Sequence, residues 1–131
     1  MDILPVEHID GVEYIQGDFL EKETIKKITK FFNNHKIDLI LSDISPNLTG
    51  ISVADSSRVN HLGELVLNFC YDNLSVDGTL LLKTFHGSGY SQLVEKYKQV
   101  FCKVLRKKPD SSRSESSEVF LIAKNLKNKV V

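Results

Sequence analysis

The 131-residue sequence contains no tryptophan, only three prolines and only two cysteines, Cys70 and Cys102. The cysteines lie far apart without a Cys-x-x-Cys pair, so the sequence indicates neither a disulfide framework nor a zinc knuckle. We expect both to be small apolar residues of the core. The four histidines show no ligand spacing with one another or with the cysteines, and no metal site is predicted.

Long apolar runs and net charge are also missing. No stretch approaches the ~20 apolar residues of a membrane span, and residues 1–5 have no signal-peptide character. We therefore expect a cytoplasmic protein without a membrane segment. The 17 basic residues balance 17 acidic residues, so the total charge gives no preference for nucleic acid.

Enough apolar material is present for one small core. Hydrophobic residues make up 41% of the chain, and a domain of this size can bury roughly two-thirds of the surface of its unfolded chain. The sequence has no internal repeat, no low-complexity tract and no linker-like segment. It therefore predicts a single domain that spans residues 1–131.

Helical and extended hydrophobic patterns alternate along the chain. The unbroken apolar run at residues 37–41 is typical of a strand buried on both faces. The alternation predicts an α/β fold with parallel strands and helices on both sheet faces, and the last two strands, which no helix separates, are predicted to form an antiparallel hairpin. The expected helices are 21–33, 57–74 and 91–101, and the expected strands are 12–15, 37–41, 79–85, 103–106 and 119–123.

Three charged residues are expected at one edge of this sheet. Asp43 follows one buried strand, Lys83 lies late in the next, and Glu118 begins the last. In open α/β sheets, ligands bind at the carboxyl ends of the parallel strands. A lysine in an apolar strand needs an ionic partner or a neutral amine. Lys83 is therefore either part of an ion pair that fixes the sheet edge or part of a proton-handling site, and the pattern leaves both open.

Basic residues gather near the C-terminus, in a stretch where Asp110 is the only acid. Short clusters of this kind are usually solvated faces, and the alternative is a surface that contacts RNA phosphates. The members are Lys96, Lys98, Lys103, Arg106, Lys107, Lys108 and Arg113.

Four sequence blocks carry a resemblance to a known family. They are Gln16-Gly17-Asp18-Phe19, Ser42-Asp43-Ile44-Ser45-Pro46-Asn47, Leu82-Lys83-Thr84-Phe85, and the run from Arg106 to Arg113 that continues to Glu118-Val119-Phe120. In type and order they resemble the FtsJ-like ribose 2′-O-methyltransferases, which methylate a uridine ribose in the 23S RNA of the large ribosomal subunit. The similarity extends from Asp2 to about Lys124.

The resemblance implies roles for five residues. The family uses S-adenosyl-L-methionine and a Lys-Asp-Lys-Glu tetrad, and Asp43, Lys83 and Glu118 match its last three members as catalytic residues. Asp2 matches an acidic residue that binds the ribose of the cofactor, Asp18 matches one that faces the adenine, and Asp43 also borders the cofactor. The first tetrad lysine and the glycine-rich cofactor loop have no counterpart, since Gly87-Ser88-Gly89 follows a later strand and is interpreted as a helix lead-in.

The resemblance also implies a Rossmann-like sheet with the strand order 3-2-1-4-5-7-6. This chain would hold the C-terminal two-thirds of that fold, without the first strand and the cofactor loop, and we expect it to be an N-terminally truncated form. The exposed edges that remain are expected to favour self-association.

The implied function is S-adenosylmethionine-dependent methylation of a uridine ribose 2′-hydroxyl in 23S ribosomal RNA of the large subunit. This reaction belongs to rRNA processing and ribosome biogenesis in the cytoplasm, and the full-length protein is expected to be a monomer. Two alternatives stand beside it. The chain is either a non-catalytic RNA-binding or inert remnant of the family, or a structural α/β module in which the three charged residues form only an ion-pair cluster.

Overall fold

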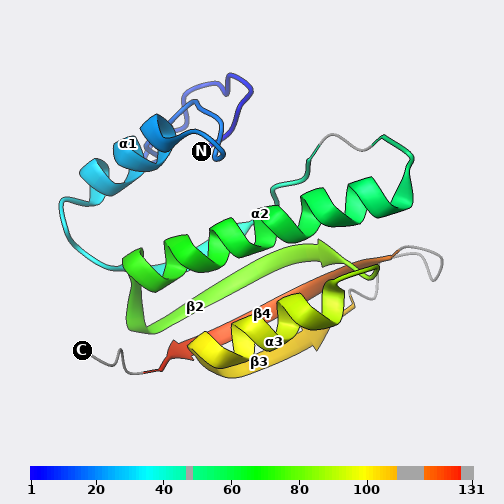
Figure 1. Ribbon diagram of the computed structural model, residues 1–131. Helices are drawn as coiled ribbons and strands as arrows, with labels where there is room; N and C mark the ends of the chain where they lie inside the picture. Colours follow the sequence, from blue (N-terminus) through cyan, green and yellow to red (C-terminus); the bar gives the residue numbers. More distant parts are fainter. Residues whose placement is uncertain (47–48, 109–116, 128–131) are drawn as a thin grey trace. The chain divides into compact units, whose positions relative to one another are not determined.

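The computed structural model describes residues 1–46, 49–108 and 117–127 (Figure 1). The chain divides into two compact units, residues 1–36 and 37–131, and each is described by itself. The assignment of residues 1–131 to one domain stays a prediction. In chain order the described elements are α1 (Lys22–Phe32), β1 (Ile37–Ser42), α2 (Ser52–Asn73), β2 (Leu74–Phe85), α3 (Tyr90–Val100), β3 (Phe101–Lys107) and β4 (Glu118–Leu126).

The first unit consists of an irregular segment and helix α1. Asp2 forms an isolated parallel bridge with Gln16, and the Gly17 N–H donates to the Asp2 carbonyl oxygen at 2.9 Å. The expected strand at residues 12–15 is therefore wrong, because the segment beside it pairs at a single position, which is too little for a strand. Gly17 touches Thr24 of α1 so closely that a Cβ would lie 2.5 Å from Thr24 Oγ1.

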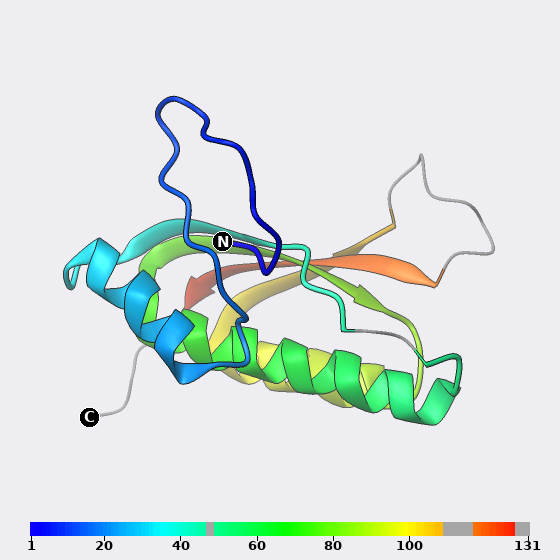
Figure 2. The same ribbon diagram turned by 90° about the horizontal axis from the view of Figure 1, so that it is seen from above.

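The second unit contains a four-stranded sheet, within the described residues, in the order β1-β2-β4-β3. Strands β1 and β2 are parallel, whereas β4 lies between β2 and β3 and is antiparallel to both. This order is the 4-5-7-6 part of the expected sheet, so the α/β class and the C-terminal antiparallel hairpin are confirmed. Figures 1 and 2 show that α2 and α3 lie side by side on the same face of this sheet.

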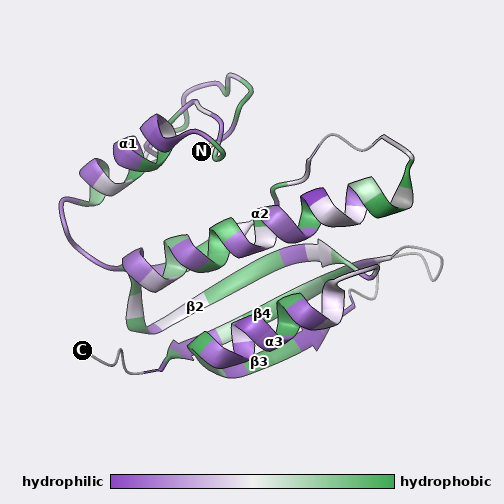
Figure 3. Ribbon diagram, viewed as in Figure 1, coloured by the Kyte–Doolittle hydropathy of each residue, from purple (hydrophilic) through white to green (hydrophobic). Residues whose placement is uncertain are grey.

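The core of the second unit lies between the sheet and these two helices. Leu80, Leu82 and Thr84 of β2 are at most 3% exposed and face the helices. Side chains alternate between the faces of a strand, so Lys83 and Phe85 lie on the opposite face. Figure 3 shows that the hydrophobic colouring of β2 is interrupted by a hydrophilic stretch near its carboxyl end.

Helix α2 and strand β2 both begin earlier than the sequence predicted. Helix α2 begins at Ser52 rather than at residue 57, and β2 begins at Leu74 rather than at residue 79. Strand β1 pairs with both the start and the second half of β2, and the register shifts in between. Gly78 lies in that irregularity, where a Cβ would be 2.6 Å from the Leu74 side chain. A glycine at this point is typical of a helix end. The Asp77-Gly78 pair nevertheless lies within β2, and α2 ends earlier, at Asn73.

Two expected burials are wrong. Leu39 and Leu41 of β1 are 55% and 67% exposed, because they lie on the sheet face opposite α2 and, within the described residues, β1 pairs only with β2. Cys70 is fully buried as expected, and burial raises its pKa to about 12. Cys102 is exposed, because it lies on β3 at the edge of the sheet.

A buried hydrogen bond joins α2 to α3. The hydroxyl of Tyr97 on α3 donates to the carbonyl oxygen of Gly63 on α2 at 2.6 Å, and Tyr97 is fully buried. Burial raises the pKa of this phenol, so it stays a donor. Gly63 also leaves room for the Leu93 side chain. A Cβ at position 63 would lie 2.8 Å from Leu93 Cδ2, which is too close.

We expect Tyr97→Phe to lower the free energy of unfolding by about 0.5–1.5 kcal/mol, because the variant keeps the ring but loses the hydrogen bond that the hydroxyl donates to the Gly63 carbonyl. Urea denaturation followed by circular dichroism measures this difference. An unchanged midpoint and slope would show that the hydrogen bond contributes nothing to stability.

Candidate active site

Lys83 and Asp43 form an ion pair at the carboxyl ends of β1 and β2. Asp43 directly follows β1, and the parallel register sets Ser42 opposite Leu82, the residue before Lys83. The Lys83 side chain is 18% exposed, whereas the Asp43 side chain is 81% exposed. The carboxylate thus lies at the surface and holds a lysine whose stem lies in the sheet.

Glu118 lies at the same edge of the sheet. It begins β4 opposite Phe85, two residues beyond Lys83, and therefore shares a face with Lys83. In the next row, Lys83 is opposite Phe120, and Lys107 of β3 continues that row. The structure thus gathers the three predicted catalytic residues at one edge. Phe120 and Lys107 lie beside them and were not predicted as site residues. Strand alternation would have indicated both residues if the register of the strands had been known.

The two predicted cofactor residues of the first unit lie on neighbouring backbone segments. The Asp2–Gln16 bridge sets Asp2 beside the segment that leads to Asp18. Asp2 Oδ1 accepts from the Leu4 N–H at 3.2 Å, and Asp18 Oδ1 accepts from the Leu20 N–H at 2.9 Å. Carboxylates accept hydrogen bonds from hydroxyl and amino groups, which are the donors that an adenosine offers.

The methionine part of S-adenosylmethionine has no comparable set of residues in the described chain. The only Gly-x-Gly run of the sequence, Gly87-Ser88-Gly89, follows β2 and lies against α2. A Cβ on Gly87 would lie 2.9 Å from Ser56 Oγ, and one on Gly89 would lie 2.3 Å from Asn60 Nδ2. Gly89 has a φ of 85° and precedes α3. These glycines therefore serve close loop packing and the start of a helix.

Asp55, in the first turn of α2, fixes the segment that leads into this helix. Its carboxylate accepts from the Thr49 N–H and hydroxyl, both at 2.8 Å, and from the Gly50 N–H at 3.0 Å. The backbone hydrogen bond from Thr49 is the main cause that lowers the Asp55 pKa, and Arg58 contributes to the same effect. The sequence analysis missed this residue, although an acid in the first turn after Thr-Gly is a recognisable helix-start pattern.

Asn60 fixes the loop that follows β2. Its side-chain N–H donates to the Ser88 carbonyl oxygen at 2.7 Å. Asp55 and Asn60 therefore attach two loops to one helix, one loop preceding α2 and the other following the strand that carries Lys83. This role of Asn60 leaves no local signal in the sequence, because its partner is a backbone atom 28 residues away.

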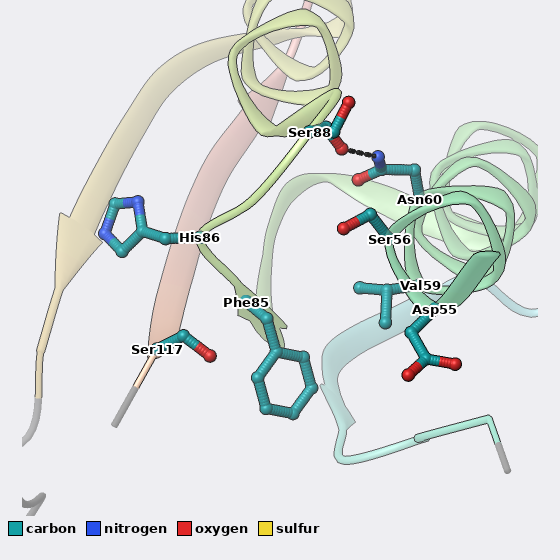
Figure 4. A pocket seen from close by; sticks show the side chains of 8 residues that line it. All are labelled: Asp55, Ser56, Val59, Asn60, Phe85, His86, Ser88 and Ser117. Carbon is teal, nitrogen blue, oxygen red and sulfur yellow. Dashed lines mark hydrogen bonds between the residues drawn. The ribbon is translucent and has the colours of Figure 1, made fainter. Parts of the chain in front are cut away.

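A pocket of about 240 Å³ lies between α2 and the segments next to the ends of β2 and β4 (Figure 4). Ser56, Val59 and Asn60 line its α2 side together with Asp55. Figure 4 shows the Ser56 hydroxyl and the Asn60 carbonyl oxygen pointing from α2 toward the opposite side. The residues of that side are Phe85, His86, Ser88 and Ser117.

The lysines of the basic stretch that the structure describes form two groups. One group pairs with acidic residues, and the other is exposed on the strands. Lys96 pairs with Glu64, and Lys98 pairs with Glu95 at 3.4 Å. On the strands, Lys103 and Lys107 of β3 are exposed, and Lys124 of β4 lies opposite Lys103. We call these three the basic strand surface. Arg113 lies outside the described residues.

In residues 1–46, 49–108 and 117–127, no helix is long and apolar enough to cross a bilayer. The same residues contain no group of three or more histidine, cysteine or acidic side chains that could hold a metal ion.

Comparison with known proteins decides the family. The model of the FtsJ-like methyltransferases matches residues 1–126. The chain belongs to the FtsJ-like methyltransferase family. The resemblance carried by the four sequence blocks is thereby confirmed. The Asp43–Lys83 ion pair lies within the region that the family model matches.

The FtsJ-like chain is 48% identical over 127 residues to the ribosomal RNA large subunit methyltransferase E of Bordetella pertussis. The match covers 97% of this chain and 60% of that protein. The protein of the same name from Paraburkholderia xenovorans is also 48% identical, with 97% and 58% covered. The FtsJ-like chain thus spans about 60% of the length of these curated relatives.

A solved structure has the same fold. The crystal structure of a Plasmodium falciparum protein assigned as a ribosomal RNA methyltransferase superposes on the FtsJ-like chain with a TM-score of 0.83. The two sequences are 26% identical, and the match covers 95% of this chain and 69% of the other. The Rossmann-like methyltransferase fold is thereby confirmed.

We expect Asp55→Asn to lower the melting temperature at neutral pH, because an amide replaces the charged acceptor of three hydrogen bonds. A lowered pKa means that the stabilisation by Asp55 is fully present above its ordinary pKa of 3.8 and is lost as the pH falls through the lower folded value. The gap between wild type and variant should therefore be constant above about pH 5 and close in stronger acid.

Thermal melts followed by circular dichroism across this pH range measure the gap. Asp77→Asn is the matched control, because it removes the charge of an exposed acid in β2, and its gap should be small throughout. An Asp55→Asn gap that stays constant down to the acid limit would contradict the expectation.

Proposed function

We propose that this chain carries the hydroxyl-orienting part of an enzyme that methylates the ribose 2′-hydroxyl of a uridine in large-subunit ribosomal RNA, with S-adenosylmethionine as methyl donor. The observation that carries the proposal is the Asp43–Lys83 ion pair at the ligand-binding edge of a methyltransferase sheet. The relatives from Bordetella and Paraburkholderia, named as ribosomal RNA large subunit methyltransferases, support the substrate class.

S-adenosylmethionine would supply a methyl group on a sulfonium sulfur, which is an excellent leaving group. Asp2 and Asp18 are the residues proposed to hold the ribose hydroxyls and the adenine amino group of this cofactor. Asp43 is proposed as a further cofactor-binding residue. Carboxylates suit these positions because they accept hydrogen bonds from hydroxyl and amino donors.

Lys83 is proposed to orient the reacting hydroxyl. Its side-chain amine would donate hydrogen bonds to the 2′-oxygen and hold it in line with the methyl group. Asp43 holds the Lys83 side chain in place through the ion pair, and Glu118 adds a second carboxylate on the same face.

The basic strand surface is proposed to contact RNA phosphates. Lys103, Lys107 and Lys124 are exposed on neighbouring strands, and phosphate contacts of this type supply most sequence-independent affinity for RNA. We also propose that the protein acts in the cytoplasm during ribosome biogenesis and is monomeric at the length of its relatives.

In the version extended through the reading frame upstream of Met1, we expect Lys83→Ala to reduce methyl transfer by about 10²–10⁴-fold without changing the melting temperature. The measurement is transfer of tritium from S-adenosylmethionine to large ribosomal subunits that lack the modification. Lys26→Ala, which removes an exposed lysine of α1, is the control and should keep full activity. Equal loss of activity and thermal stability would mean that the ion pair is only structural.

The same assay should compare the 131-residue chain with a version extended through the reading frame upstream of Met1. Activity of the extended version supports the methyltransferase proposal. Absence of transfer in both would favour the alternative of a non-catalytic remnant.

We expect the 131-residue chain not to bind S-adenosylmethionine detectably in isothermal titration calorimetry. The described residues offer carboxylates for its adenosine part and no glycine-rich turn for its methionine part. Tight binding at one molecule per chain would contradict this expectation and would show that the turn is not needed.

A further inference from the structure

The pocket between α2 and the end of β2 adjoins the proposed catalytic edge. Phe85, which lines the pocket, is two residues beyond Lys83, and Ser117, on the same side, directly precedes Glu118. Two residues of a strand span about 6.6 Å, which is comparable to the reach from a ribose hydroxyl across the attached base. Because Lys83 lies on the sheet face opposite α2, a nucleotide whose ribose lies at Lys83 reaches this pocket by extending its base around the carboxyl end of β2.

The pocket combines apolar and polar lining residues, which suits a flat ring that carries polar groups at its edge. Val59 and Phe85 provide apolar surface, and Ser56 and Asn60 direct oxygen atoms toward the opposite side (Figure 4). The volume of about 240 Å³ is below the ~300–1,000 Å³ typical of drug-sized ligands, so it suits a single base.

The pocket is held in shape before any ligand arrives. Asn60 is hydrogen-bonded to Ser88 on the opposite side, so the two sides are tied together. Gly87 and Gly89 lie against α2 with no room for side chains, which fixes the loop that separates β2 from α3. Asp55 anchors the segment before α2. Preorganised walls lower the cost of binding.

We propose that this pocket binds the base of the nucleotide whose ribose is presented to Lys83. The proposal rests on the proposed function and deepens it by assigning the residues that receive the base. A base within a duplex cannot enter such a pocket, so the substrate must be single-stranded or must rotate the nucleotide out of its stack.

The test is a titration of the ¹⁵N-labelled 131-residue chain with a short single-stranded RNA that contains one central uridine, followed by NMR. We expect the amide signals of Ser56, Asn60, Ser88 and Ser117 to shift. Ser56→Leu fills the pocket and should weaken RNA binding at least tenfold. Ser57→Leu adds the same side chain to the exposed neighbouring position on α2 and should bind as the wild type does.

A second variant guards against misfolding, because Ser56 lies against Gly87. Ser117→Leu obstructs the pocket from an exposed position outside the helices and strands. Melting temperatures and spectral dispersion verify the fold of all three variants. Pocket variants that are folded and bind RNA with wild-type affinity would overturn the proposal.

The outcomes separate this proposal from the methyltransferase assignment. Shifts confined to the basic strand surface would overturn the base pocket but leave RNA binding intact. Pocket shifts caused by adenosine and not by uridine would assign the pocket to the cofactor and overturn the proposal. If no RNA binds, the base pocket is overturned, whereas methyl transfer is decided independently by the tritium assay.

Discussion

A charged amine inside an apolar strand is the constraint on which the edge of this sheet depends. The side chain of Lys83 starts among apolar neighbours in β2, and its ammonium requires a counter-charge close to the point where the strand ends. Parallel pairing with β1 supplies Asp43 at that point, and antiparallel pairing with β4 supplies Glu118 on the same face. The strand order and the chemistry of the edge are therefore linked, since a different neighbour of β2 would leave this lysine without its carboxylates.

Helix α2 has a second task besides covering the sheet. Its buried face supplies core residues such as Val66 and Cys70, while its first three turns hold the loops on either side of the site through Asp55 and Asn60. Rigid elements position functional loops more accurately than loops position themselves. The same helix thus stabilises the fold at one end and holds the loops beside the proposed catalytic edge at the other.

The parts of this arrangement that follow local patterns were predictable. Helical spacing and apolar runs located α1, α3 and β1, and the charged residues after apolar strands indicated the edge that holds Asp43 and Lys83. The start of β2 was missed because Gly78 is also a typical helix-end residue, and only the pairing with β1 on both sides of it places it within a strand. The pocket was missed because its walls are joined by tertiary contacts that leave no periodic trace in the sequence.

The position of β4 between β2 and β3 has a consequence for how the molecule is made. A chain leaving the ribosome releases β2, α3 and β3 before β4 exists, and within the described sheet β3 has no neighbour other than β4. Until the last strand emerges, β2 has a free edge and Glu118 is absent from the site. Folding of this sheet is therefore completed only after β4 has emerged, and products that stop before residue 118 expose an unpaired hydrophobic strand that quality-control proteases and chaperones recognise.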